Sequence, residues 1–339
     1  MAWKRRQSAT RIASLTSGRA ERFAERWLRL EHGANAGPLL HVACFYGFLA
    51  LLVVPGAVVA WPWRLALIVL VTLLNYSLTI GVMHMHCHRW LFTAAAPNRV
   101  LELLLCFPSF LTSAEMTVLH VHHHHKHNDG DHDVTSTLGT ERGLRAVGYW
   151  FAYGSIVKSF TVKELYLRKL HPSWRRLGFR WKFALDSVVC IGAAVALTVW
   201  SPWVALTCYW IPFAVTHVTI GYFSWLTHAP AGDRESVDGS INNVDNLLNL
   251  FIFNQGYHAI HHRHPGIHWS DIPDRLALMT EIDPQYIVPY WVTPNSAWRI
   301  VDGERFRDPE HGEAWKARLE TRLADGTYRS RGLPYFVWI

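Results

Sequence analysis

Hydrophobic residues are concentrated in four long stretches that occur in two pairs. The first pair covers residues 38–61 and 65–83, and the second covers residues 183–200 and 202–226. Each stretch is close to the ~20 apolar residues that an α-helix needs to cross the hydrocarbon core of a bilayer. Because very few residues separate the two members of a pair, each pair predicts a helical hairpin. The pattern therefore predicts an all-α integral membrane protein with four transmembrane helices in two hairpins.

The polar segments between these stretches predict the orientation in the membrane. The two hairpin tips carry one basic residue, Arg64, whereas the N-terminus, residues 84–182 and the C-terminal part carry the rest. Because Lys and Arg are enriched on the cytoplasmic side, these three regions should face the cytoplasm, with a helical cap there. Residues 98–113 are apolar but short and contain Glu102 and Pro108, so they predict an interfacial or re-entrant segment.

The same pattern divides the chain into three regions. Residues 1–37 are basic, and hydrophobic residues from Phe23 to Leu30 recur at helical spacing with arginines between them. This segment predicts an amphipathic helix, which lies either on a membrane surface or in solvent. Residues 38–275 form the four-span membrane domain, and residues 276–339 form a C-terminal cytoplasmic cap.

Composition supports a membrane protein and excludes several functions. Half of the residues are hydrophobic, 17% are charged, and 17 are tryptophan, a residue enriched at membrane interfaces. The net charge of +7 does not form a basic stripe with interleaved aromatics, so nucleic acid is not an expected partner. Anionic headgroups of the lipid bilayer or an acidic redox partner fit this charge better. None of the five cysteines forms a CxxC pattern, which argues against an iron–sulfur or zinc-ribbon site.

Histidine supplies the candidate chemistry, because fifteen of the 21 histidines fall within residues 84–132 and 258–268. Histidine is the commonest metal ligand in proteins. The first group, "HMHCH", follows the second hydrophobic stretch. If the helix continues, His84 and His88 lie one turn apart on a shared face and can approach one metal.

The second group lies in "HVHHHHKHNDGDHD", residues 120–133, and allows two readings. An HxxHH spacing selects His120, His123 and His124, whereas an HxxxHH spacing selects His120, His124 and His125. Helical spacing alone does not choose between them. The aspartates that follow could accept hydrogen bonds from ligand imidazoles, or they could belong to a solvated loop.

The third group is an unambiguous HxxHH spacing formed by His258, His261 and His262. A lone histidine, His228, directly follows the fourth hydrophobic stretch. The predicted topology brings all of these histidines to one cytoplasmic face. Eight to ten imidazoles exceed the four ligands of a tetrahedral zinc site, and they fit two metal ions with nitrogen-rich shells, such as iron.

These three groups, in this order and with these spans between them, resemble the histidine boxes of the membrane fatty-acid desaturase and hydroxylase superfamily. Members of that superfamily are non-haem di-iron enzymes. The resemblance covers residues 38–270 and implies two iron ions, with O2 as co-substrate. It also implies that a histidine placed like His228 completes the site, and that an asparagine such as Asn254, or one of Asn242, Asn243 and Asn246, assists through water. The implied set of metal ligands is His84, His88, His120, His123, His124, His125, His228, His258, His261 and His262.

The resemblance further implies an O2-dependent oxidoreductase that acts on a fatty acid or a fatty-acyl carrier. Desaturation of an unactivated C–C bond is the leading expectation. Hydroxylation of the chain and oxidative decarboxylation to a terminal 1-alkene are alternatives, and a divalent metal transporter is the non-enzyme alternative. Since the chain shows no redox-cofactor domain, electrons should come from an external ferredoxin, rubredoxin or cytochrome.

Overall fold

The computed structural model describes residues 19–53, 61–140, 142–161, 177–229, 240–245, 247–288 and 308–327. These residues are mostly helical and include one pair of very short parallel strands, in which Asn242 pairs with Ile287. The elements are α1 (Arg19–Trp27), η1 (Gly33–Asn35), α2 (Ala36–Val53), α3 (Trp61–Tyr76), η2 (Ser77–Met83), α4 (His84–His88), α5 (Ala95–Ser109), α6 (Ser113–Met116), η3 (Thr117–His124), α7 (His125–His127), α8 (Leu144–Thr161), α9 (Leu177–Trp200), α10 (Pro202–Ala205), η6 (Leu206–Trp210), α11 (Ile211–His228), β1 (Asn242–Asn243), α12 (Leu248–Phe251), α13 (His258–Arg263), η8 (Trp269–Glu281), η9 (Pro284–Tyr286), β2 (Ile287–Val288) and α15 (Pro309–Ala324).

Four continuous helices in the described part of the chain are long and apolar enough to cross a bilayer, as the hydrophobic pattern predicts. They are Gly33–Val53, Trp61–His88, Phe179–Trp200 and Pro202–His228. The second and fourth extend beyond the predicted stretches and end on histidines, because helix continues past the apolar residues. A bent pair, Ala95–Ser109 with Ser113–His127, turns by 89° at its break. It contains the segment that the sequence predicts to be interfacial or re-entrant.

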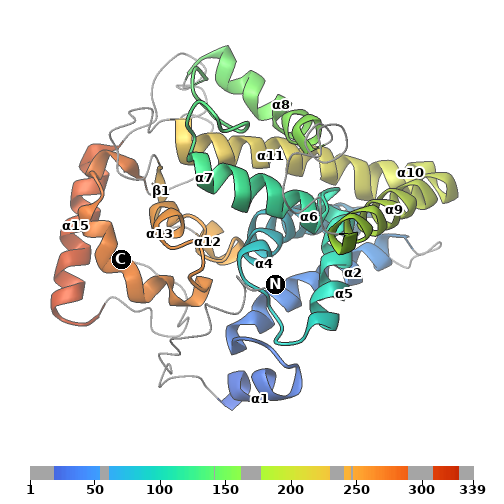
Figure 1. Ribbon diagram of the computed structural model, residues 1–339, viewed down its shortest axis with the longest axis horizontal. Coiled ribbons are helices and arrows are strands. Elements are labelled where there is room, and N and C mark those ends of the chain that lie inside the picture. Colours follow the sequence, from blue (N-terminus) through green and yellow to red (C-terminus); the bar gives the residue numbers. More distant parts are fainter. Residues whose placement is uncertain are drawn as a thin grey trace.

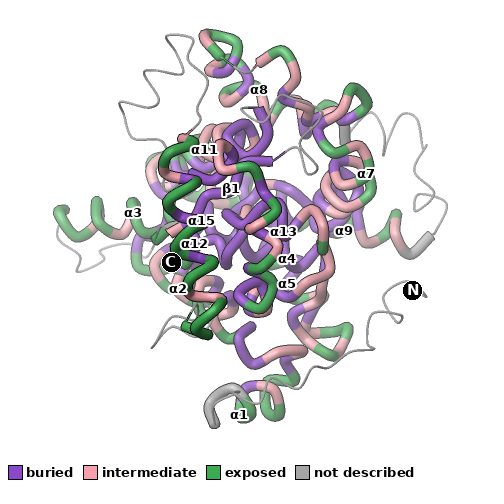
Figure 2. The backbone as a smooth tube through the Cα atoms, turned by 90° about the vertical axis from the view of Figure 1, so that its left-hand side faces the viewer, coloured by how far each residue is buried: buried purple, intermediate pink, exposed green. Residues whose placement is uncertain are grey.

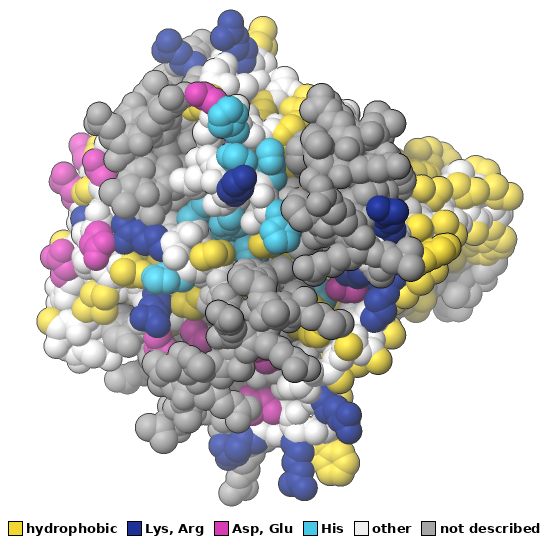
Figure 3. All heavy atoms as spheres, in the orientation of Figure 1, with side chains coloured by type: hydrophobic (Ala, Val, Ile, Leu, Met, Phe, Trp, Pro, Cys, Tyr) yellow, Lys and Arg dark blue, Asp and Glu magenta, His cyan; other side chains and the backbone are white. Residues whose placement is uncertain are grey.

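The outer faces of these helices are apolar. Side chains such as Val188, Val195, Val199 and Trp203 are more than half exposed, and Figure 3 shows apolar side chains gathered at the end of the molecule that holds α9 and α10 in Figure 1. A contiguous exposed apolar surface of this kind marks a membrane contact rather than a water-facing surface. Buried residues concentrate instead in the middle of the molecule, around α4 and α13 (Figure 2).

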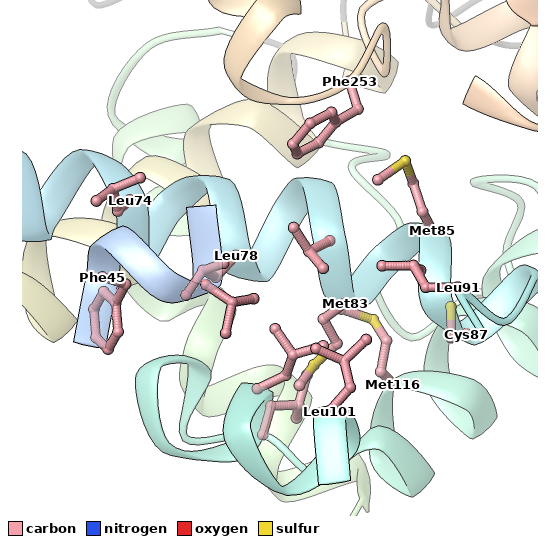
Figure 4. Close-up of a cluster of buried hydrophobic side chains, with 14 of the residues drawn as sticks. Phe45, Leu74, Leu78, Met83, Met85, Cys87, Leu91, Leu101, Met116 and Phe253 are labelled. Atoms are coloured by element: carbon pink, nitrogen blue, oxygen red, sulfur yellow. The ribbon is translucent and has the colours of Figure 1, made fainter. Parts of the chain in front are cut away.

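Two π-helical segments, η2 and η3, lead into or contain the first two histidine boxes. Such segments are rare in proteins and are frequent at functional sites. Below η2, the side chains of Met83, Leu101 and Met116 pack together on one side of the helix, and Phe253 packs on the other (Figure 4). A Cβ atom at Gly81 would lie 2.8 Å from the Phe253 ring, so glycine permits this close approach. The contact brings the segment before the third box against the first box.

A network of buried charges ties α5 to α9. The Glu102 carboxylate forms ion pairs with Lys182 Nζ at 2.8 Å and with Arg99 Nη1 at 3.4 Å. Arg99 also pairs with Asp186. Because Asp186 and Glu102 are almost fully buried, the cations compensate carboxylates that would be costly to bury alone. The network therefore explains how acidic residues are accommodated within apolar helices.

The described part of the C-terminal region packs as a second hydrophobic cluster beside the histidines. Trp315 and Leu319 of α15 are fully buried against residues that follow the third box, and the Trp315 indole donates to Asp245 at 3.0 Å. At the other end of the chain, Leu30 pairs with Phe92 directly after the first box. The predicted N-terminal segment is described only from residue 19, where α1 exposes Phe23 and Trp27 on its surface.

Candidate metal centre

The first histidine box forms the C-terminal end of the second long helix. His84, His86 and His88 are all buried in α4. The rings of His84 and His88 lie 5.4 Å apart on one face, as helical spacing predicts. His86 points away from them and approaches the Glu102 carboxylate at 3.7 Å. Two histidines of this box therefore face the other boxes, and one joins the buried charge network.

The second box is arranged by π-helical geometry. The backbone N–H of His125 donates to the carbonyl oxygen of His120, five residues earlier, which is the defining hydrogen bond of a π-turn. This wider turn brings the two Nε2 atoms of His120 and His125 to 3.0 Å. His124 faces another direction, with its ring 4.8 Å from that of His228 and 5.1 Å from that of His262.

The third box is divided in the same way. His261 places its Nε2 atom 3.1 Å from that of His84. His258 places its Nε2 atom 3.0 Å from that of His228 and 3.1 Å from that of His262. One histidine of α13 thus faces the first box, and two face the end of α11.

The histidines form two adjacent clusters. The five-histidine cluster contains His84, His88, His120, His125 and His261, and the four-histidine cluster contains His124, His228, His258 and His262. Within each cluster, one ring nitrogen from every member lies within 4.8 Å of the others. The two clusters meet at His125 and His262, whose ring centroids lie 4.6 Å apart. Figure 3 shows histidine side chains gathered in the middle of this face of the molecule.

The contacts within the five-histidine cluster fit a bound cation better than hydrogen bonding among imidazoles. His120 Nε2 lies 2.5 Å from His84 Nε2, 3.0 Å from His125 Nε2 and 3.5 Å from His261 Nε2. Each nitrogen of a neutral imidazole either donates or accepts one hydrogen bond. His120 Nε2 therefore cannot form hydrogen bonds with three neighbouring nitrogens at once. Imidazole nitrogens that converge in this way could instead be shared as ligands of one cation.

The protonation state of the third box also suits metal binding. Burial, followed by repulsion from neighbouring imidazoles, holds the pKa values of His258, His261 and His262 well below their ordinary range. These rings are therefore neutral near pH 7, and neutral imidazole is the form that binds metals. A cation needs to displace few protons from this box.

Asp133 orients the His124 ring. Its Oδ2 atom accepts a hydrogen bond from His124 Nδ1 at 2.6 Å, and its Oδ1 atom accepts from the N–H and hydroxyl of Thr135 at 2.9 and 2.8 Å. Burial alone would raise the pKa of this carboxyl, but the bonds from His124 and Thr135 outweigh burial and lower it. A carboxylate on Nδ1 leaves Nε2 unprotonated and directed into the four-histidine cluster. Sequence reasoning did not single out Thr135, although an aspartate two residues before a threonine is a turn signal.

We predict that Asp133→Asn lowers metal affinity or activity by about 10–100-fold, because the amide lacks the charge that stabilises the Nδ1–H form of His124. The measurement is bound metal per chain after dialysis against a chelator, together with turnover. Asp131→Asn is the matched control, since Asp131 is exposed in the same loop. Equal metal retention in the two variants would contradict an orienting role for Asp133.

Other histidines of the tract lie outside both clusters. His123 accepts a hydrogen bond from the Val134 backbone N–H at 2.9 Å through Nε2, and its ring packs against His127. His132 is exposed. Nine of the ten histidines implied by the sequence therefore come together, and His123 is the one that stays apart.

Two of the asparagines singled out in the sequence, Asn242 and Asn254, form hydrogen bonds with the backbone around the third box. Asn242 Oδ1 accepts from the Ala259 N–H at 2.9 Å near the start of α13. Asn254, in the left-handed region with φ 60°, donates its amide to the Trp269 carbonyl at 3.2 Å. Asn246 lies outside the described residues.

A third, smaller group brings His32 and His268 close to Asp271. Both ring nitrogens of His268 are engaged, Nδ1 with Ser270 at 2.6 Å and Nε2 with the Asn35 side chain at 2.8 Å. We interpret this group as a structural link between the start of α2 and the segment after the third box.

A cavity reaches both histidine clusters. It runs between α8, α11 and the π-helical segments, and its walls are mainly apolar. Two of its apolar lining residues lie close in sequence to cluster histidines: Leu119 directly precedes His120, and Phe223 lies five residues before His228. The cluster histidines that line it are His84, His120, His124, His228 and His258, and His217 of α11 lines it as well.

Comparison with known proteins agrees with this geometry. The sequence model of a protein family described as fatty acid desaturase matches residues 59–294, more than two thirds of the chain. A search of curated proteins finds no match. The matched region contains all three histidine boxes, His228 and the cavity. The chain therefore belongs to the fatty acid desaturase family.

Proposed function

We propose that the protein is an O2-dependent, non-haem di-iron oxidoreductase that desaturates the alkyl chain of a fatty acid or fatty-acyl carrier. The observation that carries this proposal is the apolar cavity, because it ends on histidines of both clusters. Substrate sites are typically concave and apolar, with a few polar groups converging at one place. A hydrocarbon chain in this cavity would lie against both metal positions.

In this proposal the five-histidine cluster holds one iron and the four-histidine cluster holds the other. Bound iron would supply the O2 chemistry that removes hydrogen from an unactivated C–H bond. The protein would supply neutral imidazole ligands, an orientation fixed by Asp133 and the buried packing around α4, and a cavity that excludes water from the chain. Such exclusion protects a reactive oxidant from side reactions.

The overall balance defines the partners that the reaction needs. Desaturation takes two hydrogens from the chain and reduces O2 to two waters with two further electrons and two protons. We propose that an external ferredoxin, rubredoxin or cytochrome supplies these electrons, and that the site faces the cytoplasm, because basic residues are scarce at the hairpin tips. Hydroxylation or oxidative decarboxylation would use the same site with a different position of the chain.

Feeding labelled fatty acids to a bacterium that expresses the protein tests the function. We expect alkene products from the wild type, detected by mass spectrometry of extracted lipids. Alcohols would identify hydroxylation, and terminal alkenes in the headspace would identify decarboxylation. Purified protein should contain about two irons per chain, as expected for two ligand clusters. Stoichiometric zinc without iron, and no oxidised product, would overturn the proposal.

A further inference from the structure

The cavity has a polar wall at the end farthest from the histidine clusters. His217 places its Nε2 atom 3.0 Å from the carbonyl oxygen of Ser109, so the ring donates to that oxygen. The Phe213 ring packs on His217 with centroids 4.1 Å apart. Beside them, Lys158 Nζ lies 3.0 and 3.2 Å from the two carboxylate oxygens of Glu115. Ser109, Lys158 and His217 all line the cavity.

Tight helix packing fixes this wall in place. A Cβ atom at Gly154 of α8 would lie 2.9 Å from His217 Nδ1, and one at Gly221 of α11 would lie 2.4 Å from the Trp150 carbonyl oxygen. The two helices therefore touch through backbone and leave His217 little room on that side. On the other side, the chain turns sharply after Ser109, where Phe110 adopts a left-handed conformation with φ 49°.

The position of the wall limits the length of a bound chain. His217 precedes His228 by eleven residues on the same continuous helix. At ~1.5 Å per residue the two are separated by about 16 Å along the axis. The position of His217 therefore sets how much of an alkyl chain can lie beyond the metal positions.

The charges at the wall indicate which end of a fatty acid it meets. The ammonium group of Lys158 is already paired with Glu115, which is 5% exposed. A substrate carboxylate placed here would share one ammonium with a second buried carboxylate, and that arrangement is unfavourable. The methyl end of a chain carries no such cost. A longer chain, however, would have to break the His217–Ser109 hydrogen bond, which would leave buried polar groups without partners.

We propose that His217, backed by Ser109 and the Lys158–Glu115 pair, stops the methyl end of the substrate and thereby selects chain length. This inference rests on the proposed function in one respect, that the cavity holds an acyl chain. It assigns to His217 a role in specificity, at a distance from the metal positions.

Two substitutions with opposite effects test the proposal. Ile220→Phe adds bulk to a cavity-lining residue one turn from His217 and should shift the preferred substrate toward shorter chains. His217→Ala removes the wall and should shift it toward longer chains. Since a methylene that does or does not fit changes relative rates about tenfold or more, the ratio of short to long products should change at least tenfold in each direction. Val215→Phe is the matched control, because Val215 lies on the same helix and is 49% exposed.

Equilibrium binding separates failure of this proposal from failure of the proposed function. Full-length protein in detergent is incubated with labelled fatty acids of about eight to eighteen carbons, and retained label is measured alongside turnover. If the wild type oxidises no acid but the binding optima of the two variants shift as described, the proposed reaction is wrong and the length selection stands. If Ile220→Phe and His217→Ala both keep the wild-type length profile in binding and in products, the proposal is overturned. If His217→Ala does not fold, the Ile220→Phe profile alone decides.

Discussion

Replacing His261 with alanine is expected to lower activity by more than about a hundredfold, because even residues that only orient metal ligands commonly contribute 10–100-fold. His261 lies at the centre of the five-histidine cluster. Its Nε2 atom is 3.0 Å from that of His125 and 3.1 Å from that of His84. In the proposed assignment, its removal takes away one ligand and the packing of two others. Iron should fall from about two ions per chain toward about one, since the four-histidine cluster keeps its own ligands.

Iron per chain and product formation are measured on the same His261→Ala preparation. The control is His132→Ala, which removes an exposed histidine from the same tract as the second box. It should retain iron and activity close to the wild type, because exposed substitutions away from special contacts usually have small effects. Full iron and full activity in His261→Ala would contradict assignment of the cluster as the metal site.

The second large effect is expected at His125, and it distinguishes the two spacings that the sequence leaves open. His125→Ala removes a member of the five-histidine cluster and should lower iron content and activity to the same degree as His261→Ala. His123→Ala removes a ring that accepts a hydrogen bond from the Val134 backbone and lies outside both clusters. Its expected cost is about 1 kcal/mol of stability from that lost bond, with iron content unchanged.

Iron analysis and thermal unfolding of the two variants give the answer in a single comparison. The HxxxHH spacing requires iron loss in His125→Ala only. The reverse result, iron loss in His123→Ala with retention in His125→Ala, would show that the second box adopts another register when metal is bound.

Some features of the fold follow from local properties of the chain. Apolar stretches of sufficient length give long helices whether or not their partners are known, so four candidate spans could be predicted. Helical spacing alone also predicted that His84 and His88 share a face. The ends of the helices could not be predicted as well. Polar histidines continue the second and fourth helices beyond their apolar residues, because contacts with other histidines, rather than lipid, surround them.

Other features depend on segments that are distant in sequence. The choice between His123 and His125 is set by a π-turn, in which residues five apart share a face, and an α-helical pattern contains no sign of it. The split of each later box between two clusters depends on how α13 packs against the first box. Phe253 and Asn254 hold left-handed conformations just before that helix, and Gly81 admits the Phe253 ring.

The sequence by itself determined that the chain is a membrane protein with three histidine boxes, since hydropathy and residue spacing are properties of neighbouring residues. The tertiary structure decided how nine of those histidines divide into clusters of five and four. It also decided that Asp133 orients His124, and that a cavity joins the clusters to a wall at His217. These outcomes require side chains up to 177 residues apart, such as those of His84 and His261, to meet. Only packing of the helices against one another can specify such distances, because no local spacing encodes them.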